Sequence, residues 1–230
     1  MNNLFNQMKK NTVNSENQLK KSQFVTYINP DGKGKRVMFM GNSITLHGIN
    51  EDIGWINEWG MAASSKEKDY VHRMISMINE KAKDCAFCIC QVASWECDYK
   101  TGSSTHSFFE AARDFQADII ITRFVENCPG TDFDGEIFKK ELDSLLKYLS
   151  SKNKTMIIMS TGFWRHPADE TIIEYANENS LPVVELGDLG EQDEMKAIDR
   201  FEHGGVANHP GDLGMEKIAE RLFEKVKEIL

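Results

Sequence analysis

Short, unbroken apolar runs alternate with amphipathic stretches along most of this chain, and this alternation limits its fold more than any other feature. Such runs are typical of strands buried on both faces of a parallel sheet. They lie at residues 36–40 (RVMFM), 86–92 (AFCICQV), 118–121 with its extension (DIIITRFV), 155–159 (TMIIM) and 181–186 (LPVVEL). Residues 23–28 (QFVTYI) predict a further, short edge strand, because turn residues follow them.

The stretches between the runs have helical periodicity. Apolar side chains recur every three or four residues in 70–78, 138–149 and 215–229, and Pro167 suits the first turn of another helix, reaching Asn179. Strand–helix alternation builds βαβ units with helices on both faces of the sheet. We therefore expect one three-layer α/β/α domain over 23–230, with about five parallel strands. Ligands of such sheets bind where the strands end, so chemistry is sought just after each run.

Composition narrows the class of protein. The 27 Lys and Arg against 36 Asp and Glu give a net charge of −9, which argues against nucleic-acid or anionic-membrane partners. No stretch approaches the roughly 20 apolar residues of a membrane span. Residues 1–22 are polar, and we expect a loosely held arm or an added helix rather than a secretory signal. Five cysteines without an export signal predict reduced thiols and a cytoplasmic location.

A serine follows the first parallel run directly, in the segment Gly41-Asn42-Ser43. A turn there holds the hydroxyl at the edge of the sheet, and a helix starting there would favour a developing oxyanion. Ordinary turn or capping chemistry is the alternative. The sequence contains no Gly-x-Ser-x-Gly, no P-loop and no Gly-x-Gly-x-x-Gly, so an α/β-hydrolase elbow and nucleotide binding are not predicted.

Two later segments place polar side chains at the same edge of the sheet. Asn127 follows the third parallel run and is a neutral amide donor suited to an oxyanion, although an Asx turn explains it as well. His209 lies in HPGDLGM, a loop before the last helix, which makes it a candidate general base. His47, four residues after Ser43, is the rival base.

GNSIT, Asn127 and HPGDLGM together resemble the SGNH (GDSL-type) hydrolase superfamily, in order and in spacing, over about residues 36–230. The resemblance implies a flavodoxin-like fold and metal-free hydrolysis of esters or thioesters, often O-acetyl groups on carbohydrates. It makes Ser43 the nucleophile, His209 the base and Asn127 an oxyanion donor. The wider pattern GNSIT…HG…GW…WGMAAS…DYVH is similar to a bacterial branch for which we expect carbohydrate-ester substrates.

The position that usually supplies the third member of the triad departs from the family pattern. Val206 stands three residues before His209, where most members have Asp, and a valine cannot stabilise an imidazolium. Either a backbone carbonyl orients the imidazole, leaving a Ser–His dyad, or a carboxylate arrives from elsewhere. The candidate carboxylates are Glu126, Asp199 and Glu202.

The family's oxyanion blocks depart as well. Val125 and the pair Ala93-Ser94 stand where glycines are usual. A backbone N–H survives either replacement, so we expect the N–H groups of Ser43 and Ser94 to act with the amide of Asn127.

Further residues near the strand ends are candidate substrate contacts. Packing is the alternative for the aromatic residues, solvation for the carboxylates, and pairing with Glu126 for the arginine. The candidates are Trp55, Trp59, Trp95, Glu96, Asp98 and Arg123, with a rim at Trp164-Arg165-His166-Pro167.

Four cysteines invite a zinc interpretation, but no second CxxC or HxxxH completes a ligand set. We therefore favour buried, inert thiols and expect no metal or cofactor. The cysteines concerned are Cys85, Cys88, Cys90 and Cys97.

The sequence thus predicts a serine esterase that removes small acyl groups, O-acetyl above all, from a carbohydrate ester through an acyl-enzyme. One alternative is a catalytically decayed carbohydrate-binding or regulatory protein on the same scaffold. The other is a hydrolase of lipid or thioester acyl chains.

Overall fold

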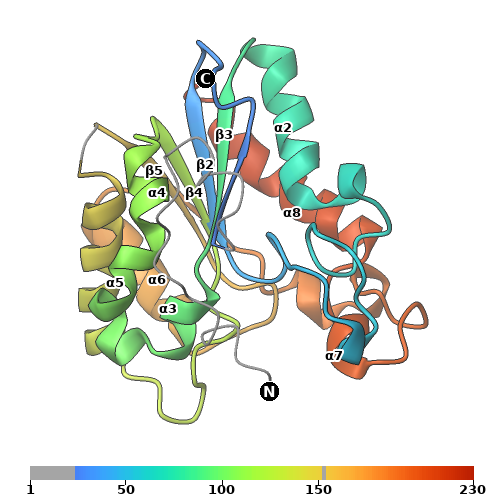
Figure 1. Ribbon diagram of the computed structural model, residues 1–230. Helices are drawn as coiled ribbons and strands as arrows, with labels where there is room; N and C mark the ends of the chain where they lie inside the picture. The colour runs from blue at the N-terminus through green and yellow to red at the C-terminus, as the bar shows by residue number, and fades with distance from the viewer. Residues whose placement is uncertain (1–23, 152–153) are drawn as a thin grey trace.

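The computed structural model describes residues 24–151 and 154–230. It shows a three-layer α/β/α arrangement, with helices on both sides of a central six-stranded sheet (Figure 1). This confirms the expected fold class. The polar arm over 1–22 and the first residue of the expected edge strand lie outside the described residues.

The sheet has the order β1-β3-β2-β4-β5-β6. Strands β2 to β6 are parallel, as expected, and β1 is an antiparallel edge strand beside β3. Numbered along the chain, the parallel strands have the flavodoxin-like order 2-1-3-4-5, whose switch point lies between β2 and β4. The strands are β1 (Val25–Ile28), β2 (Arg36–Gly41), β3 (Ala86–Gln91), β4 (Ile119–Arg123), β5 (Met156–Ser160) and β6 (Val183–Val184).

The last strand is shorter than its apolar run. The run covers 181–186, whereas β6 holds only Val183–Val184. Pro182 has no N–H to extend the ladder, and the Leu186 N–H donates to the side chain of Thr161 instead. The chain therefore leaves the sheet after two residues.

Helices cover both faces of the sheet, and each face has its own apolar core (Figure 1). The first face carries α2 (Tyr70–Lys81) and α8 (Asp212–Val226). The second carries α3 (Ala93–Cys97), η4 (Tyr99–Phe109), α4 (Glu110–Asp114), α5 (Gly135–Leu149) and α6 (Ala168–Glu178). None of these described helices is long and apolar enough to cross a membrane.

Side-chain caps explain where two of the amphipathic helices begin. The carboxylates of Asp69 and Asp134 accept the N–H groups of His72 and Ile137, at the starts of α2 and α5. Shorter helical turns occupy the loops. They are η2 (Glu51–Ile53), η3 (Lys66–Lys68), η5 (Leu189–Glu191), η6 (Asp193–Met195) and α7 (Gly204–Ala207).

A third, smaller apolar cluster lies outside the two sheet cores. In it Trp55, Met61 and Ala62, from the loop after β2, pack against Ala197 and Val206, from the segment before α8. The cluster joins two loops that lie far apart in the sequence. It holds the segment after β2 beside the segment that leads into α8.

Gly41, the last residue of β2, lies where neighbouring atoms leave no room for a side chain. A Cβ there would lie 1.8 Å from Thr45 Oγ1 and 2.6 Å from the Arg123 carbonyl oxygen. Because that carbonyl belongs to the paired strand β4, Gly41→Ala should lower the free energy of unfolding by about 1–3 kcal/mol. Urea denaturation measures the loss.

Gly48→Ala is the matched control, since a Cβ at Gly48 meets nothing within 4 Å. It should change the free energy of unfolding by no more than about 0.5 kcal/mol. Equal losses in the two variants would contradict the close approach at Gly41.

Candidate active site

The fold brings Ser43 and His209 into contact across 166 residues of sequence: Ser43 Oγ lies 2.8 Å from His209 Nε2. Ser43 follows β2 in a turn closed by the N–H groups of Thr45 and Leu46, which donate to the Asn42 carbonyl. His209 stands just before α8. A hydroxyl within hydrogen-bonding reach of an imidazole is the nucleophile–base pair of acyl-transfer chemistry.

A backbone carbonyl, and no carboxylate of the described chain, orients the imidazole. His209 Nδ1 lies 2.7 Å from the Gly205 carbonyl oxygen in α7. A carbonyl oxygen only accepts, so Nδ1 carries the proton and the Nε2 lone pair faces Ser43. Val206 is buried in the third cluster against apolar neighbours. Of the alternatives open from the sequence, the geometry selects the backbone carbonyl.

The candidate carboxylates are engaged elsewhere or stand apart from His209. Glu126 lies in an ion pair with Arg123, 2.7 Å between Nη2 and Oε2. In the described part of the chain, Asp199 and Glu202 form no hydrogen bond with His209. The expectation of Glu126 as the third triad member is therefore corrected: its oxygens are occupied by Arg123 and by neighbouring N–H groups.

Burial lowers the pKa of His209 to about 4, because the interior disfavours the charged imidazolium, while the Gly205 hydrogen bond acts in the opposite direction. At neutral pH the imidazole is thus uncharged and able to accept the Ser43 proton. Burial also lowers the pKa of His47. The Nδ1 atom of His47 lies 2.6 Å from the Gly48 carbonyl oxygen, and within the described residues this ring makes no hydrogen bond to Ser43.

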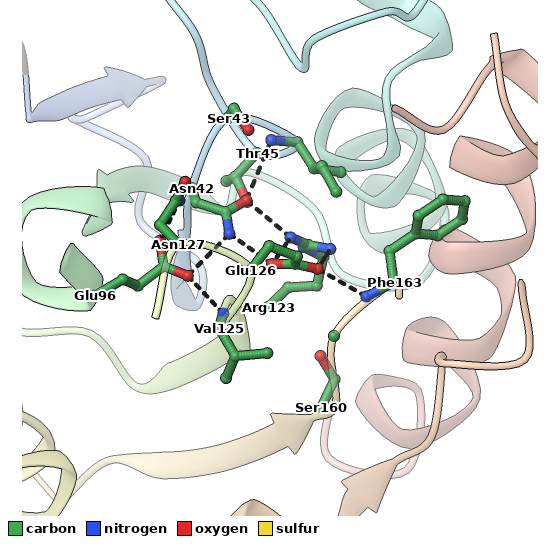
Figure 2. A network of polar contacts seen from close by, with 12 residues as sticks. Asn42, Ser43, Thr45, Glu96, Arg123, Val125, Glu126, Asn127, Ser160 and Phe163 are labelled. Carbon is green, nitrogen blue, oxygen red and sulfur yellow. Dashed lines mark hydrogen bonds and ion pairs between the residues drawn. The ribbon is translucent and has the colours of Figure 1, made fainter. Parts of the chain in front are cut away.

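A buried polar network lies next to Ser43 and joins the ends of β2 and β4 to α3 (Figure 2). The fully buried Arg123 donates to both carboxylate oxygens of Glu126, at 2.7 Å each, and to Asn42 Oδ1 at 2.8 Å. Asn42 Nδ2 donates to Glu126 at 2.6 Å and to Glu96 at 3.0 Å. Both ends of the Asn42 amide are held, which fixes the residue directly before Ser43.

Three of the expected substrate contacts are wrong, because the side chains have no exposed surface. Arg123 pairs with Glu126 inside the network. Trp95 packs edge-on against Phe124 and Phe138 in the core. Glu96 is also fully buried. The positions of these residues near strand ends were predicted correctly, but the inward direction of their side chains was not.

The two tryptophans of the loop after β2 pack against one another and against the third cluster. Trp55 is fully buried in the third cluster, so the expectation of a substrate contact there is wrong as well. Trp59 is half-buried, lies edge-on to Trp55 and donates from Nε1 to the Ala63 carbonyl. By contrast Trp164, in the expected rim, is half-buried against the imidazole of His209, with ring centroids 5.5 Å apart.

The backbone donors expected for an oxyanion hole are free of protein acceptors. Within 24–151 and 154–230, the N–H groups of Ser43 and Ser94 donate to no protein atom. Ser94 lies in the first turn of α3, where backbone N–H groups lack intrahelical partners. Asn127 is exposed, and its Nδ2 atom donates to Glu96 Oε2 at 2.7 Å.

Val125 has a backbone conformation that side-chain-bearing residues rarely adopt, with φ of +134°. It occupies a position where the SGNH pattern has glycine. Its N–H donates to Glu96 Oε1 at 2.5 Å, and its side chain is buried in the core. A glycine-like backbone is thus retained here on a β-branched residue, held by a carboxylate and by packing.

Cysteine placement follows the sequence interpretation with one exception. Cys88 and Cys90 lie together in one core cluster, and burial raises the pKa of both thiols. Cys85 is buried too, whereas Cys97 is exposed, because it ends the short helix α3 at the surface. Among the described residues, no group of three or more His, Cys, Asp or Glu side chains is placed to hold a metal ion.

Comparisons with known proteins find likeness in structure only. The sequence matches no protein-family model and no curated protein. The esterase EstA from Pseudoalteromonas sp. aligns with 84% of this chain and 97% of its own, at 8% identity and a TM-score of 0.56. The acetyl xylan esterase AlAXEase aligns with 83% of this chain and 99% of its own, at 15% identity and 0.52.

A third solved structure carries the family name. It is a member of the lipolytic protein G-D-S-L family from Veillonella parvula, aligned with 85% of this chain and 99% of its own, at 14% identity and a TM-score of 0.50. Each likeness spans nearly the whole of the other protein. The flavodoxin-like fold implied by the sequence resemblance is therefore confirmed.

The strain at Val125 reverses the usual order of two substitutions. At most buried sites glycine is less stable than alanine by about 0.5–1 kcal/mol, because it loses more conformational entropy. At a φ of +134° any Cβ is unfavourable, so Val125→Gly should be more stable than Val125→Ala by about 1 kcal/mol. Chemical denaturation of both variants gives the difference.

Val37, buried in β2 and without a positive φ, is the control site. There the alanine variant should be the more stable of the two. The same order at both sites would show that Val125 is not strained.

Proposed function

We propose that this chain is a serine ester hydrolase that uses a Ser43–His209 dyad. His209 Nε2 takes the hydroxyl proton as Ser43 Oγ attacks the ester carbonyl carbon. The tetrahedral intermediate then expels the alcohol, which receives that proton, and leaves an acyl group on Ser43. Water attacks the acyl-enzyme with His209 again as the base, and the acid is released. The 2.8 Å contact between Oγ and Nε2 carries this proposal.

The oxyanion would be held by the N–H groups of Ser43 and Ser94 and by the amide of Asn127. Two observations support this. The backbone N–H groups have no protein acceptor in the described chain. Asn127 is exposed and contacts Glu96, which also accepts from Asn42, the residue before Ser43. Donors held in place before reaction stabilise the developing charge without reorganisation. A catalytically decayed binding protein would have no need of this arrangement.

For the substrate we propose a small acyl ester, in particular an O-acetyl ester of a carbohydrate. The acetyl xylan esterase that shares the fold supports this class. Trp164 offers a partly exposed aromatic surface directly beside His209, suited to packing against a sugar ring. We place the aromatic contact here rather than at Trp55 or Trp95, which are buried.

Hydrolysis of 4-nitrophenyl acetate and labelling by a fluorophosphonate test the assignment together. The wild-type protein should hydrolyse the ester and be labelled on Ser43, whereas Ser43→Ala should do neither. Ser76→Ala, an exposed serine of α2, is the matched control and should keep full activity. Asn127→Ala should lower kcat by about 10²–10³-fold, the effect of losing one oxyanion donor.

Each other outcome has a distinct meaning. Unchanged activity in Ser43→Ala would exclude it as the nucleophile, and a folded wild-type protein that is not labelled would be a binding protein. A series of 4-nitrophenyl esters from acetyl to octanoyl separates acetyl esterase from lipid hydrolase. Activity should fall as the acyl chain lengthens.

The acid limb of the pH profile reports on His209. Since burial lowers its pKa to about 4, the base form persists below the ordinary histidine range. The value of kcat/KM should therefore be level from about pH 5 to 7 and fall through a midpoint near pH 4. A midpoint between about 6 and 7, the unperturbed range, would contradict a buried, neutral base.

The same shift affects stability, so folding is followed at each pH. The unfolded chain binds a proton at His209 near pH 6.5, while the folded chain does so only near pH 4. The free energy of unfolding is therefore unaffected by His209 above about pH 6.5 and decreases as the pH falls from there towards 4, because only the unfolded chain then gains the proton. Circular dichroism at each pH separates loss of the base from loss of the fold.

A further inference from the structure

We propose that Glu96 is a positioning residue, whose carboxylate keeps the NH₂ end of the Asn127 amide in place for the substrate oxyanion and holds the backbone of Val125 beside it. Figure 2 shows the Glu96 carboxylate meeting the Asn127 side chain and the backbone N–H of Val125. The inference rests on the proposed function, because it assigns Glu96 to the oxyanion side of that site.

Every hydrogen bond that Glu96 makes comes from an N–H group. Its Oε1 atom accepts from the Val125 N–H at 2.5 Å and from Asn42 Nδ2 at 3.0 Å. Its Oε2 atom accepts from Asn127 Nδ2 at 2.7 Å. Both oxygens are thus required as acceptors, and only the ionised carboxylate offers acceptors alone.

Glu96 has no cation of its own among the described residues. Its side chain is fully buried, and the nearby guanidinium of Arg123 is directed at Glu126 and Asn42. Burial and the charge of Glu126 raise the pKa of Glu96 above its ordinary value, and the three N–H donors offset part of this rise. Each donor is therefore held by the ionised carboxylate that it helps to stabilise.

An asparagine amide has a donor end and an acceptor end, and its neighbours decide which way it points. A carboxylate oxygen 2.7 Å away requires the NH₂ end of Asn127 to face Glu96. One N–H is used in this contact, and the second remains for a substrate oxygen. A glutamine at position 96 would remove this requirement, because its own NH₂ group accepts no hydrogen bond and would favour the reversed amide.

The Val125 contact acts on the same loop, two residues before Asn127. With φ at +134°, this backbone would gain by relaxing to a commoner conformation. A hydrogen bond to a charged acceptor is roughly twice as strong as a neutral one. Glu96 thus opposes the relaxation that would carry Asn127 away from Ser43.

Glu96→Gln keeps the size of the side chain and removes the charge. We expect kcat for 4-nitrophenyl acetate to fall by about 10–100-fold with little change in KM, since a misplaced oxyanion donor weakens mainly the transition state. Glu141→Gln is the matched control: Glu141 is a buried glutamate on α5 that accepts the Ser103 N–H, away from the site. It should keep kcat within about twofold. An unchanged kcat in Glu96→Gln would overturn the proposal.

A double-mutant cycle shows whether Glu96 acts through Asn127. If it does, Glu96→Gln should lower kcat by no more than about twofold once Asn127 is already alanine, because the group to be positioned is gone. Losses that multiply in the double variant would overturn the proposal, since Glu96 would then act by another route. Circular dichroism and thermal unfolding confirm that the compared variants are folded.

The wild-type protein provides a test that needs no stable variant. Asn127 is exposed, yet one of its two Nδ2 hydrogens donates to Glu96. That hydrogen should exchange with solvent at least about tenfold more slowly than the side-chain amide hydrogens of Asn79, an exposed asparagine of α2. Equal exchange would overturn the proposal. Failure of the proposed function is seen separately, as absent fluorophosphonate labelling of Ser43, and does not alter this exchange result.

Discussion

The buried ion pair between Arg123 and Glu126 is the interaction on which the site depends. A guanidinium with no exposed surface is tolerated only when carboxylate and amide oxygens surround it, and here Glu126 and Asn42 supply them. Arg123 ends β4 and Glu126 follows it, whereas Asn42 follows β2. The hydrogen bonds of Asn42 with both members of the pair therefore tie together the two strands at the switch point of the sheet. Ser43 follows Asn42 directly, so its position depends on these contacts.

His209 is held by different means. In the described chain, His209 takes its orientation from the Gly205 carbonyl, and the usual carboxylate position is filled by Val206, packed in the third apolar cluster with Trp55. A carbonyl fixes the tautomer as a carboxylate would, but it stabilises the imidazolium less. The cluster packs the segment before His209 against the loop that follows Ser43. Burial keeps the imidazole neutral, and a neutral imidazole is the form that accepts a proton.

The elements were predictable because periodic apolar patterns reflect burial along the chain. The five parallel strands, the edge strand and the helices α2, α5, α6 and α8 follow from that periodicity, and β6 is shorter than its apolar run. The short helices α3, η4 and α4, between β3 and β4, were not predicted. Side-chain direction at strand ends was not predictable. Trp95 lies just after β3 and Arg123 ends β4, where substrate contacts were expected. Both side chains point inward instead, because Trp95 packs against Phe124 and Arg123 pairs with Glu126.

The sequence by itself determined the order of the strands and of the long amphipathic helices, the α/β/α class and the strand ends at which chemistry is sought, since local periodicity and the rules of parallel sheets suffice for these. Only the tertiary structure decided that a carbonyl rather than a carboxylate contacts His209, and that Glu96 turns inward to meet Asn127. The second contact joins residues 31 apart in the sequence, and the first, although only four residues apart, depends on the short helix α7 that turns the Gly205 carbonyl towards the imidazole. No local sequence pattern predicts to which of several nearby acceptors a buried donor will hydrogen-bond.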